Sequence, residues 1–363
     1  MSGGVDSSVA ALLAQRMGYD CTGVTMRLIP DDGLLRCACN DGKDSCNDRK
    51  DPCNDSIVTA RSGSDEAVRS AERVAGALGI PHLVFDFRRE FEAKVIRPFV
   101  DSYMNGSTPN PCIDCNAGIK FGLLYEYAKM HGFDKLATGH YARIVSDGRG
   151  IRLARAAHTG KDQSYFLYRL SPEILSGVLF PLGDLNKDEV RNMAKEAELE
   201  CAERSDSQDI CFIPEEGHAA FIEGYLGGSL GEGDFVDASG NVLGRHKGIS
   251  RYTVGQRKGL GIALGRPVFV KEIRPGTNEI ILSDEEDLFT DKIELEDVVL
   301  YADKPVRPQV MIRYRAEPVW AEIESESDGH LQVGFDKPVR APARGQSAVL
   351  YFGDIVIGGG RIR

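Results

Sequence analysis

Hydrophobic and polar residues in the first half of the chain alternate between helical and strand-like spacing. Five segments keep their apolar residues on one helical face: residues 6–18, 64–79, 90–104, 119–132 and 186–199. Three shorter apolar runs between them are typical of buried strands: residues 21–28, 82–87 and 135–140. Strands that alternate with helices predict an α/β fold with a doubly wound parallel sheet over residues 1–215.

The pattern changes in the second half of the chain. Short runs punctuated by glycine, at residues 233–246 and 266–273, predict hairpins and a small mixed domain over residues 216–290. From about residue 294 onward, short β-type segments predict a small all-β barrel or sandwich over residues 291–363. We therefore expect three domains.

One polar segment does not fit the α/β pattern. Residues 29–63 are rich in Asp and Asn and lie where a short connection is usual, so we interpret them as an insertion. The insertion carries four cysteines, Cys37, Cys39, Cys46 and Cys53. Four thiolates suit tetrahedral Zn²⁺, which predicts a small structural zinc knot. The alternative is an insertion with incidental cysteines.

Composition narrows the cellular context. The chain has nine cysteines, an odd number, so the thiols are better interpreted as reduced, metal-bound or catalytic than as fully paired in disulfides. No apolar run reaches the roughly 20 residues that cross a bilayer, and we expect a cytoplasmic protein with no membrane partner. The net charge of −11 argues against binding nucleic acid over the whole surface, but it does not exclude a local basic face.

A glycine-containing string opens the first predicted helix. "SGGVDSS", residues 2–8, combines two glycines, which permit a close approach of the backbone, with the free amides of a helix start. Both features favour a phosphate group. The string lacks the Gly-Lys-Ser/Thr ending of a Walker A loop.

Cysteine and histidine motifs supply further candidate chemistry. "NPCIDCN", residues 110–116, places Cys112 and Cys115 three apart, as in a redox pair, half a zinc site, part of an iron–sulfur ligand set, or a nucleophile with a neighbour. Cys211 lies in the short apolar string "SQDICF" and, taken alone, is typical of a buried structural cysteine. His140 follows a predicted strand, where side chains line the ligand crevice of open α/β sheets.

Taken together, the motifs resemble one family. The strings are, in order, "SGGVDSS", "TPNPCIDCN", "IKF", "ATGHYAR", "KDQSYFL", "DICF", "YTVGQRKGLG", "RYR" and "GQSAVLY". Their order and spacing are similar to those of the tRNA-specific 2-thiouridylases of the MnmA type, which belong to the ATP pyrophosphatase superfamily. The resemblance covers nearly the whole chain apart from the insertion.

The resemblance implies an activity and a set of site residues. Family members use ATP, with Mg²⁺, to adenylate the C2 oxygen of the wobble uridine in the tRNA anticodon loop, and they replace it with sulfur. The sulfur comes from a cysteine desulfurase or a persulfide relay protein. Residues implied to contact ATP are Gly3, Gly4, Val5, Asp6, Ser7, Ser8, Met26 and Gly139. Cys211 is implied to carry the persulfide and Cys115 to be its partner nucleophile. Residues implied to face the target base or the tRNA are Asn110, Pro111, Cys112, His140, Lys161, Asp162, Gln163, Arg313, Tyr314 and Gln346.

Two departures from the family pattern leave alternatives open. Many relatives have an aspartate where this chain has Cys112, so Cys112, Cys115 and Cys211 are also a candidate ligand set for a [4Fe–4S] cluster. The persulfide route needs only two of these cysteines. In addition, the family has a hydrophobic strand before the phosphate loop, and here Met1 directly precedes Ser2, so we expect the natural start to lie upstream.

Two other classes of protein compete with this interpretation. Another enzyme of the pyrophosphatase type, such as an amidotransferase-linked ligase, would leave Cys211 and the β module without a use. A non-catalytic tRNA-binding protein would leave the phosphate loop unexplained.

Overall fold

The computed structural model describes residues 1–29, 65–148, 150–203, 210–301, 307–327 and 329–363. The insertion cysteines Cys37, Cys39, Cys46 and Cys53 lie outside these residues, so the zinc knot stays a prediction. The chain forms two compact units. The first comprises Met1–Arg89 and Arg191–Ser229, and the second comprises Glu90–Val190 and Leu230–Arg363.

The first unit is built on a parallel strand pair. Its strands and principal helices are α1 (Val5–Arg16), β1 (Gly23–Arg27), α2 (Asp65–Leu78), β2 (His82–Asp86) and α9 (His218–Leu226). Strands β1 and β2 pair in register from Gly23 opposite His82 to Arg27 opposite Asp86. The parallel pairing confirms the prediction for this region, and a second parallel pair occurs in the other unit, between β3 (Leu136–Ala137) and β6 (Val178–Leu179).

Two helical stretches in the middle of the chain each contain a π-helical segment. The first runs through α3 (Arg88–Phe91), η1 (Glu92–Ile96) and α4 (Arg97–Met104), and the second runs through α5 (Pro111–Cys115), η2 (Asn116–Leu123) and α6 (Leu124–Met130). The second stretch begins eight residues earlier than the sequence pattern predicts, because Pro111 occupies the first turn, where its missing N–H is not needed. Such π segments frequently occur at functional sites.

The remaining short helices connect these parts. They are η3 (Thr159–Lys161), η4 (Ser164–Leu167), α7 (Pro172–Ser176), α8 (Lys187–Glu196), η5 (Ile249–Arg251) and η6 (Glu286–Leu288). None of the described helices is long and apolar enough to span a membrane.

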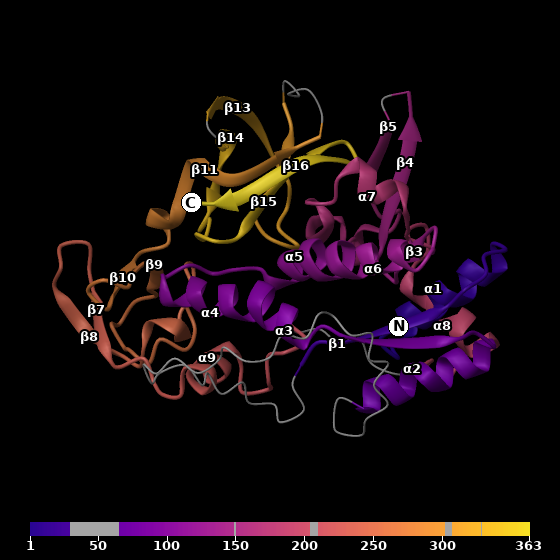
Figure 1. Cartoon of the computed structure of the whole chain (residues 1–363). Helices are drawn as coiled ribbons and strands as arrows, with labels where there is room; N and C mark the ends of the chain where they lie inside the picture. The colour runs from indigo at the N-terminus through magenta and orange to yellow at the C-terminus, as the bar shows by residue number, and fades with distance from the viewer. Residues whose placement is uncertain (30–64, 149, 204–209, 302–306, 328) are drawn as a thin grey trace, which may run out of the picture. The chain divides into compact units, whose positions relative to one another are not determined.

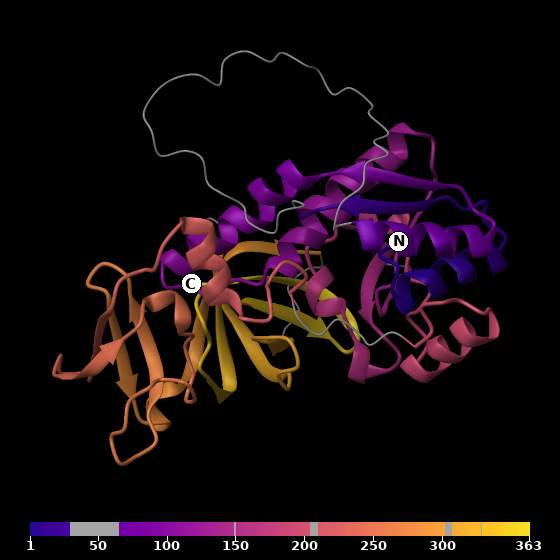
Figure 2. The same cartoon turned by 90° about the horizontal axis from the view of Figure 1, so that it is seen from below.

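The second unit contains two β structures that lie side by side (Figures 1 and 2). A four-stranded sheet has the order β8-β7-β10-β9, formed by β7 (Gly233–Val236), β8 (Val242–His246), β9 (Phe269–Arg274) and β10 (Glu279–Ser283). Phe235, Val270 and Ile280 form part of its buried core. This sheet confirms the small mixed domain that the hairpin pattern predicts.

The C-terminal strands form a closed antiparallel barrel. They are β11 (Phe289–Leu300), β12 (Gln309–Met311), β13 (Val319–Ser327), β14 (His330–Arg340), β15 (Ser347–Phe352) and β16 (Ile355–Ile362). Pairing between β11 and β16 closes the sheet, which distinguishes the barrel from the predicted alternative of a sandwich. A hairpin that sequence analysis missed, β4 (Ala142–Asp147) with β5 (Gly150–Arg155), extends this sheet where Ala154 pairs with Ile355 of β16.

Candidate active site

The loop before α1 has the geometry of an anion cradle. Gly3 has φ +72°, and a Cβ there would lie 2.7 Å from the Cβ of Ser70, so only glycine fits without rearrangement. Gly4 is the N-cap of α1, and because it has no side chain it leaves the first helical amides without a side-chain cap. The hydroxyls of Ser7 and Ser8 both donate to the Gly4 carbonyl, at 3.1 and 2.9 Å, and fix the turn. The arrangement fits a phosphate group at the helix start.

Other residues implied to contact ATP lie on both units. Val5, Asp6, Ser7 and Ser8 belong to α1, and Met26 lies half-buried on β1, all in the first unit. Gly139 lies half-buried just after β3 in the second unit.

The two neighbouring cysteines lie on α5, directly after the proline-initiated turn. Neither is in a disulfide, and Cys115 is 8% exposed while Cys112 is half-buried. Burial raises the pKa of the Cys112 thiol, the nearby Lys120 ammonium lowers it, and Cys115 and Asp114 raise it further. Cys112 is therefore a neutral thiol at pH 7, and it does not supply the negative charge of an aspartate at this position.

The one acidic residue on α5 is held away from such a role. Asp114 accepts from Arg361 of β16 at 2.7 Å and from Arg169 at 3.4 Å, and its side chain is only 18% exposed. Because two guanidinium groups hold its carboxylate, Asp114 anchors α5 to the barrel. It is a structural carboxylate in this state of the protein.

His140 belongs to a second polar centre, which the charge of Lys120 links to Cys112. The imidazole of His140 packs against the rings of Phe121 and Phe180, at centroid distances of 5.7 and 6.0 Å, and its Nδ1 is 2.9 Å from the Thr138 hydroxyl. Burial, with a further contribution from Lys120, holds the pKa of His140 well below its usual value. His140 is thus a neutral hydrogen-bonding group.

Lys120 is a residue that the sequence analysis left without a role. It lies in η2, within the "IKF" string, and it acts electrostatically on both Cys112 and His140. The string matched the family pattern, but nothing in its spacing indicated that the ammonium would lie near these two side chains.

Cys211 lies in the first unit, at the edge of an apolar cavity. It is exposed, which contradicts the interpretation of a buried structural cysteine. The cavity has a volume of about 470 Å³. Its lining includes Ile29, Phe212, Ile213, Pro214, Phe221 and Tyr225. The rings of Phe212 and Phe221 pack at 5.1 Å, so the wall beside the thiol is aromatic.

The segment after β5 is organised by a buried carboxylate. Asp162 is 7% exposed and accepts from the Ala156 amide at 2.9 Å and from the Ser164 hydroxyl at 2.8 Å. Gln163 accepts from the Tyr141 amide at 3.0 Å. Lys161 lies half-buried at the end of η3. Asp162 therefore has internal partners, and its effect on a ligand would come through the placement of Lys161 and Gln163.

The "RYR" string follows β12. Tyr314 packs on Phe166, with ring centroids 4.4 Å apart, and the guanidinium of Arg315 lies 5.3 Å from the Tyr314 ring centroid. Arg313 is exposed and donates to the carbonyl of Arg340 at 2.9 Å. An exposed arginine beside a half-buried tyrosine is a combination that RNA-binding surfaces use for phosphate contact and base stacking.

A barrel loop holds the segment that leads into α5. Gln346 donates from Nε2 to the Thr108 carbonyl at 2.8 Å and to the Pro109 carbonyl at 3.4 Å. The Thr108 amide donates to the Arg344 carbonyl at 2.7 Å. Gly345 has φ +87°, and a Cβ there would lie 3.0 Å from the Cβ of Ser107. This contact, which we call the loop clasp, positions Asn110 and Pro111 ahead of the two cysteines.

The described residues contain no group of three or more His, Cys, Asp or Glu side chains arranged to hold a metal ion. Cys112 and Cys115 belong to the second unit and Cys211 to the first. The iron–sulfur ligand set therefore stays a prediction, as does the Mg²⁺ site.

Three family models match consecutive parts of the chain. They are a tRNA methyl transferase HUP domain over residues 1–215, a tRNA methyl transferase PRC-barrel domain over residues 219–284, and an aminomethyltransferase β-barrel domain over residues 290–362. The fold and the phosphate loop thus define a HUP-type enzyme followed by two β modules.

Curated relatives match from end to end. The tRNA-specific 2-thiouridylase MnmA of Clostridioides difficile is 44% identical over 100% of this chain and 96% of its own length. That of Lachnoclostridium phytofermentans is 45% identical over 100% and 98%, and that of Treponema denticola is 42% identical over 100% and 96%. The chain belongs to the tRNA-specific 2-thiouridylase (MnmA) family.

Proposed function

We propose that this protein is a tRNA sulfurtransferase that uses ATP to replace the C2 oxygen of the wobble uridine with sulfur. One observation carries the proposal: a chain that matches 2-thiouridylases from end to end has cysteines at both positions 115 and 211, and neither of them is in a disulfide. A ligase of the same superfamily would have no use for this pair. A passive tRNA-binding protein would have no use for the phosphate cradle at residues 2–8.

The adenylation half of the reaction is assigned to the first unit. The amides at the start of α1 and the cradle around Gly3 would hold the phosphates of ATP, whose charge Mg²⁺ would partly neutralise. The C2 oxygen attacks the α-phosphorus, pyrophosphate leaves, and N3 of the base gives up its proton. A urea-like carbonyl oxygen, which is a poor leaving group, thereby becomes part of AMP.

Sulfur transfer is assigned to the two cysteines. A sulfur donor, such as a cysteine desulfurase or a relay protein, loads Cys211 as a persulfide, for which its exposure is suited. The terminal sulfur bonds to C2 and AMP leaves with the oxygen. The Cys115 thiolate then attacks the Cys211 sulfur and breaks the S–S bond, which leaves a thione on C2 as N3 regains a proton. The resulting Cys115–Cys211 disulfide takes two electrons from an external dithiol before the next turnover.

The experiment uses purified protein, in vitro transcribed tRNA, ATP and a persulfide donor, with 2-thiouridine measured by mass analysis of nucleosides and AMP by chromatography. We expect Cys115→Ser and Cys211→Ser each to abolish 2-thiouridine while ATP binding persists. The matched control is Cys21→Ser, because Cys21 is a half-buried cysteine of the first unit that is not in a disulfide and has no role in the proposed reaction. Full activity of Cys211→Ser, or AMP release that does not depend on tRNA, would refute the proposal.

An iron–sulfur route is the second candidate, favoured by the third cysteine on α5. Cys112, Cys115 and Cys211 could ligate three irons of a [4Fe–4S] cluster and leave one iron open for sulfide. Anaerobic purification with iron and sulfide analysis, followed by Cys112→Ser, separates the routes. A colourless enzyme that tolerates Cys112→Ser supports the persulfide route. A brown enzyme that loses iron and activity together in this variant supports the cluster.

A further inference from the structure

The central four-stranded sheet carries a basic segment to which the proposed reaction gives no role. Residues 245–274 contain eight Lys or Arg and one acidic residue, Glu272, in a chain whose net charge is −11. Three of the basic residues have acidic partners: Arg245 with Asp234, Arg266 with Asp284, and Arg274 with Glu272.

Other basic side chains in this segment face solvent without such partners. Arg257, Lys258 and Lys271 are exposed, and no acidic group among the described residues lies within ion-pair distance of them. Uncompensated positive charge on one segment of an acidic protein creates a local field that attracts a polyanion.

The turn that presents Arg257 and Lys258 is fixed by the side chain of Gln256. Its Oε1 accepts from the Thr253 amide at 3.0 Å, and its Nε2 donates to the Lys258 carbonyl at 3.0 Å. The Gly255 amide donates to the Val270 carbonyl at 2.7 Å, which ties the turn to β9. The two cationic side chains therefore start from a backbone held on both sides.

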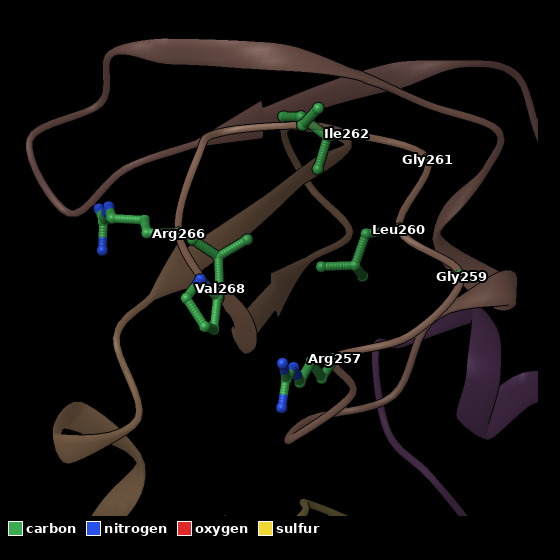
Figure 3. Close-up of a pocket in the computed structure, with 9 residues that line it drawn as sticks. Arg257, Gly259, Leu260, Gly261, Ile262, Arg266 and Val268 are labelled. Carbon is green, nitrogen blue, oxygen red and sulfur yellow. The ribbon is translucent and has the colours of Figure 1, made fainter.

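A cavity of about 500 Å³ lies inside the loop that follows this turn. The side chains of Leu260, Ile262 and Val268 point toward this open cavity, and those of Arg257 and Arg266 lie at its rim (Figure 3). Gly259 and Gly261 have φ of +78° and +71°, so the loop turns sharply where only glycine is unstrained. We call residues 255–268 the glycine loop.

We propose that the glycine loop binds the sugar–phosphate backbone of tRNA, as a contact additional to the thiolation site; this inference rests on the proposed function. A guanidinium at the rim matches the geometry of a phosphate, and the cavity beside it is open to solvent and lined by both polar and apolar atoms, which leaves room for the attached ribose. Because the proposed substrate of the enzyme is itself a polyanion, the proposed function favours tRNA over an acidic protein segment as the occupant. Phosphate contacts of this kind position an RNA without reading its sequence.

The test is tRNA binding by the full-length protein at several salt concentrations between 50 and 200 mM. The variant is Arg257→Gln with Lys258→Gln, and the matched control is Lys337→Gln, which removes an exposed cation from β14. Losing one or two phosphate contacts reduces the slope of log K against log salt by about 1 to 2, and we expect affinity at low salt to fall about tenfold or more. The control should keep the wild-type slope.

A single variant, a competing polyanion and the thiolation assay complete the test. If the double variant has a lowered thermal midpoint, the single variant Lys258→Gln replaces it. We expect its slope of log K against log salt to change by about half as much as in the double variant. Wild-type slope and affinity in folded variants would overturn the proposal. Polyglutamate that binds the wild type as tightly as tRNA and loses binding in the variant would also overturn it, in favour of an acidic partner. If the wild type binds tRNA but makes no 2-thiouridine, the proposed function fails, and the glycine loop is still judged by binding alone.

Discussion

The anchoring of α5 by Asp114 gives a prediction whose size follows from the structure. Asp114→Asn keeps the shape of the side chain but removes the charge that Arg361 and Arg169 contact at 2.7 and 3.4 Å. Charge-assisted hydrogen bonds contribute about 1.5–3 kcal/mol each, and breaking a fully buried pair costs about 3–5 kcal/mol. Asp114 is 18% exposed, and Arg361 keeps a second partner in Asp297 at 3.3 Å, so the lower part of this range applies. We expect a loss of about 2 kcal/mol.

The control is Asp354→Asn, which removes an aspartate paired with Arg143 at 3.0 Å but 63% exposed. An exposed pair contributes about 0–1 kcal/mol, so this variant should lose less than half as much stability as Asp114→Asn. Urea unfolding followed by the fluorescence of Trp320, the single tryptophan of the chain and a residue of β13, reports on the barrel to which α5 is anchored. Equal losses in the two variants would refute the reasoning that burial of Asp114 makes the difference.

Three other perturbations have defined outcomes. Gly3→Ala should destabilise the first unit by about 1–2 kcal/mol and weaken ATP binding measured calorimetrically, because the residue has φ +72°. The control is Gly4→Ala, whose Cβ would meet only Ser2 Oγ at 3.5 Å, and it should leave the unfolding free energy unchanged. Gln346→Ala removes the hydrogen bond that the loop clasp donates to the Thr108 carbonyl, so kcat for thiolation should fall several-fold and alkylation of Cys112 should become faster. An unchanged rate of alkylation would contradict a positioning role. His140 stays neutral when folded but binds a proton when unfolded below about pH 6.5, so stability should fall from pH 7 to pH 5, and less steeply in His140→Gln.

Local patterns predicted most of the architecture. Apolar runs of strand length between amphipathic helices led to the parallel pairs, and the run of short β segments led to the barrel. The hairpin at residues 142–155 had a local signal that the sequence analysis missed, the Asp147-Gly148 turn between two strands that pair with each other. Its junction with β16 had none, because that pairing spans about 200 residues of sequence. The early start of the second helical stretch did have a signal, since proline is favoured in a first helical turn.

For the candidate site, the sequence predicted the backbone features but not the partners of the charged side chains. Backbone requirements are local, so the glycines of residues 2–8 indicated the phosphate cradle that Gly3 forms. The partners of charged side chains are not local. Nothing in the string around Asp114 indicated that Arg361 would hold it, and nothing around Asp162 indicated that its carboxylate would be buried under the Ala156 amide. These contacts depend on packing between segments far apart in the chain.

The electrostatics around α5 limit what each group there can do. Cys112 and His140 are both neutral at pH 7, and Asp114 is committed to its arginines. Lys120 is the cation that lowers the pKa of both Cys112 and His140, so it is the described charge that would favour an anion beside these two side chains. A negative group that arrives there, such as a thiolate or a phosphate, gains most from Lys120. Because Cys112 is neutral and Asp114 is held by its arginines, α5 itself supplies little negative charge to neutralise the Lys120 ammonium.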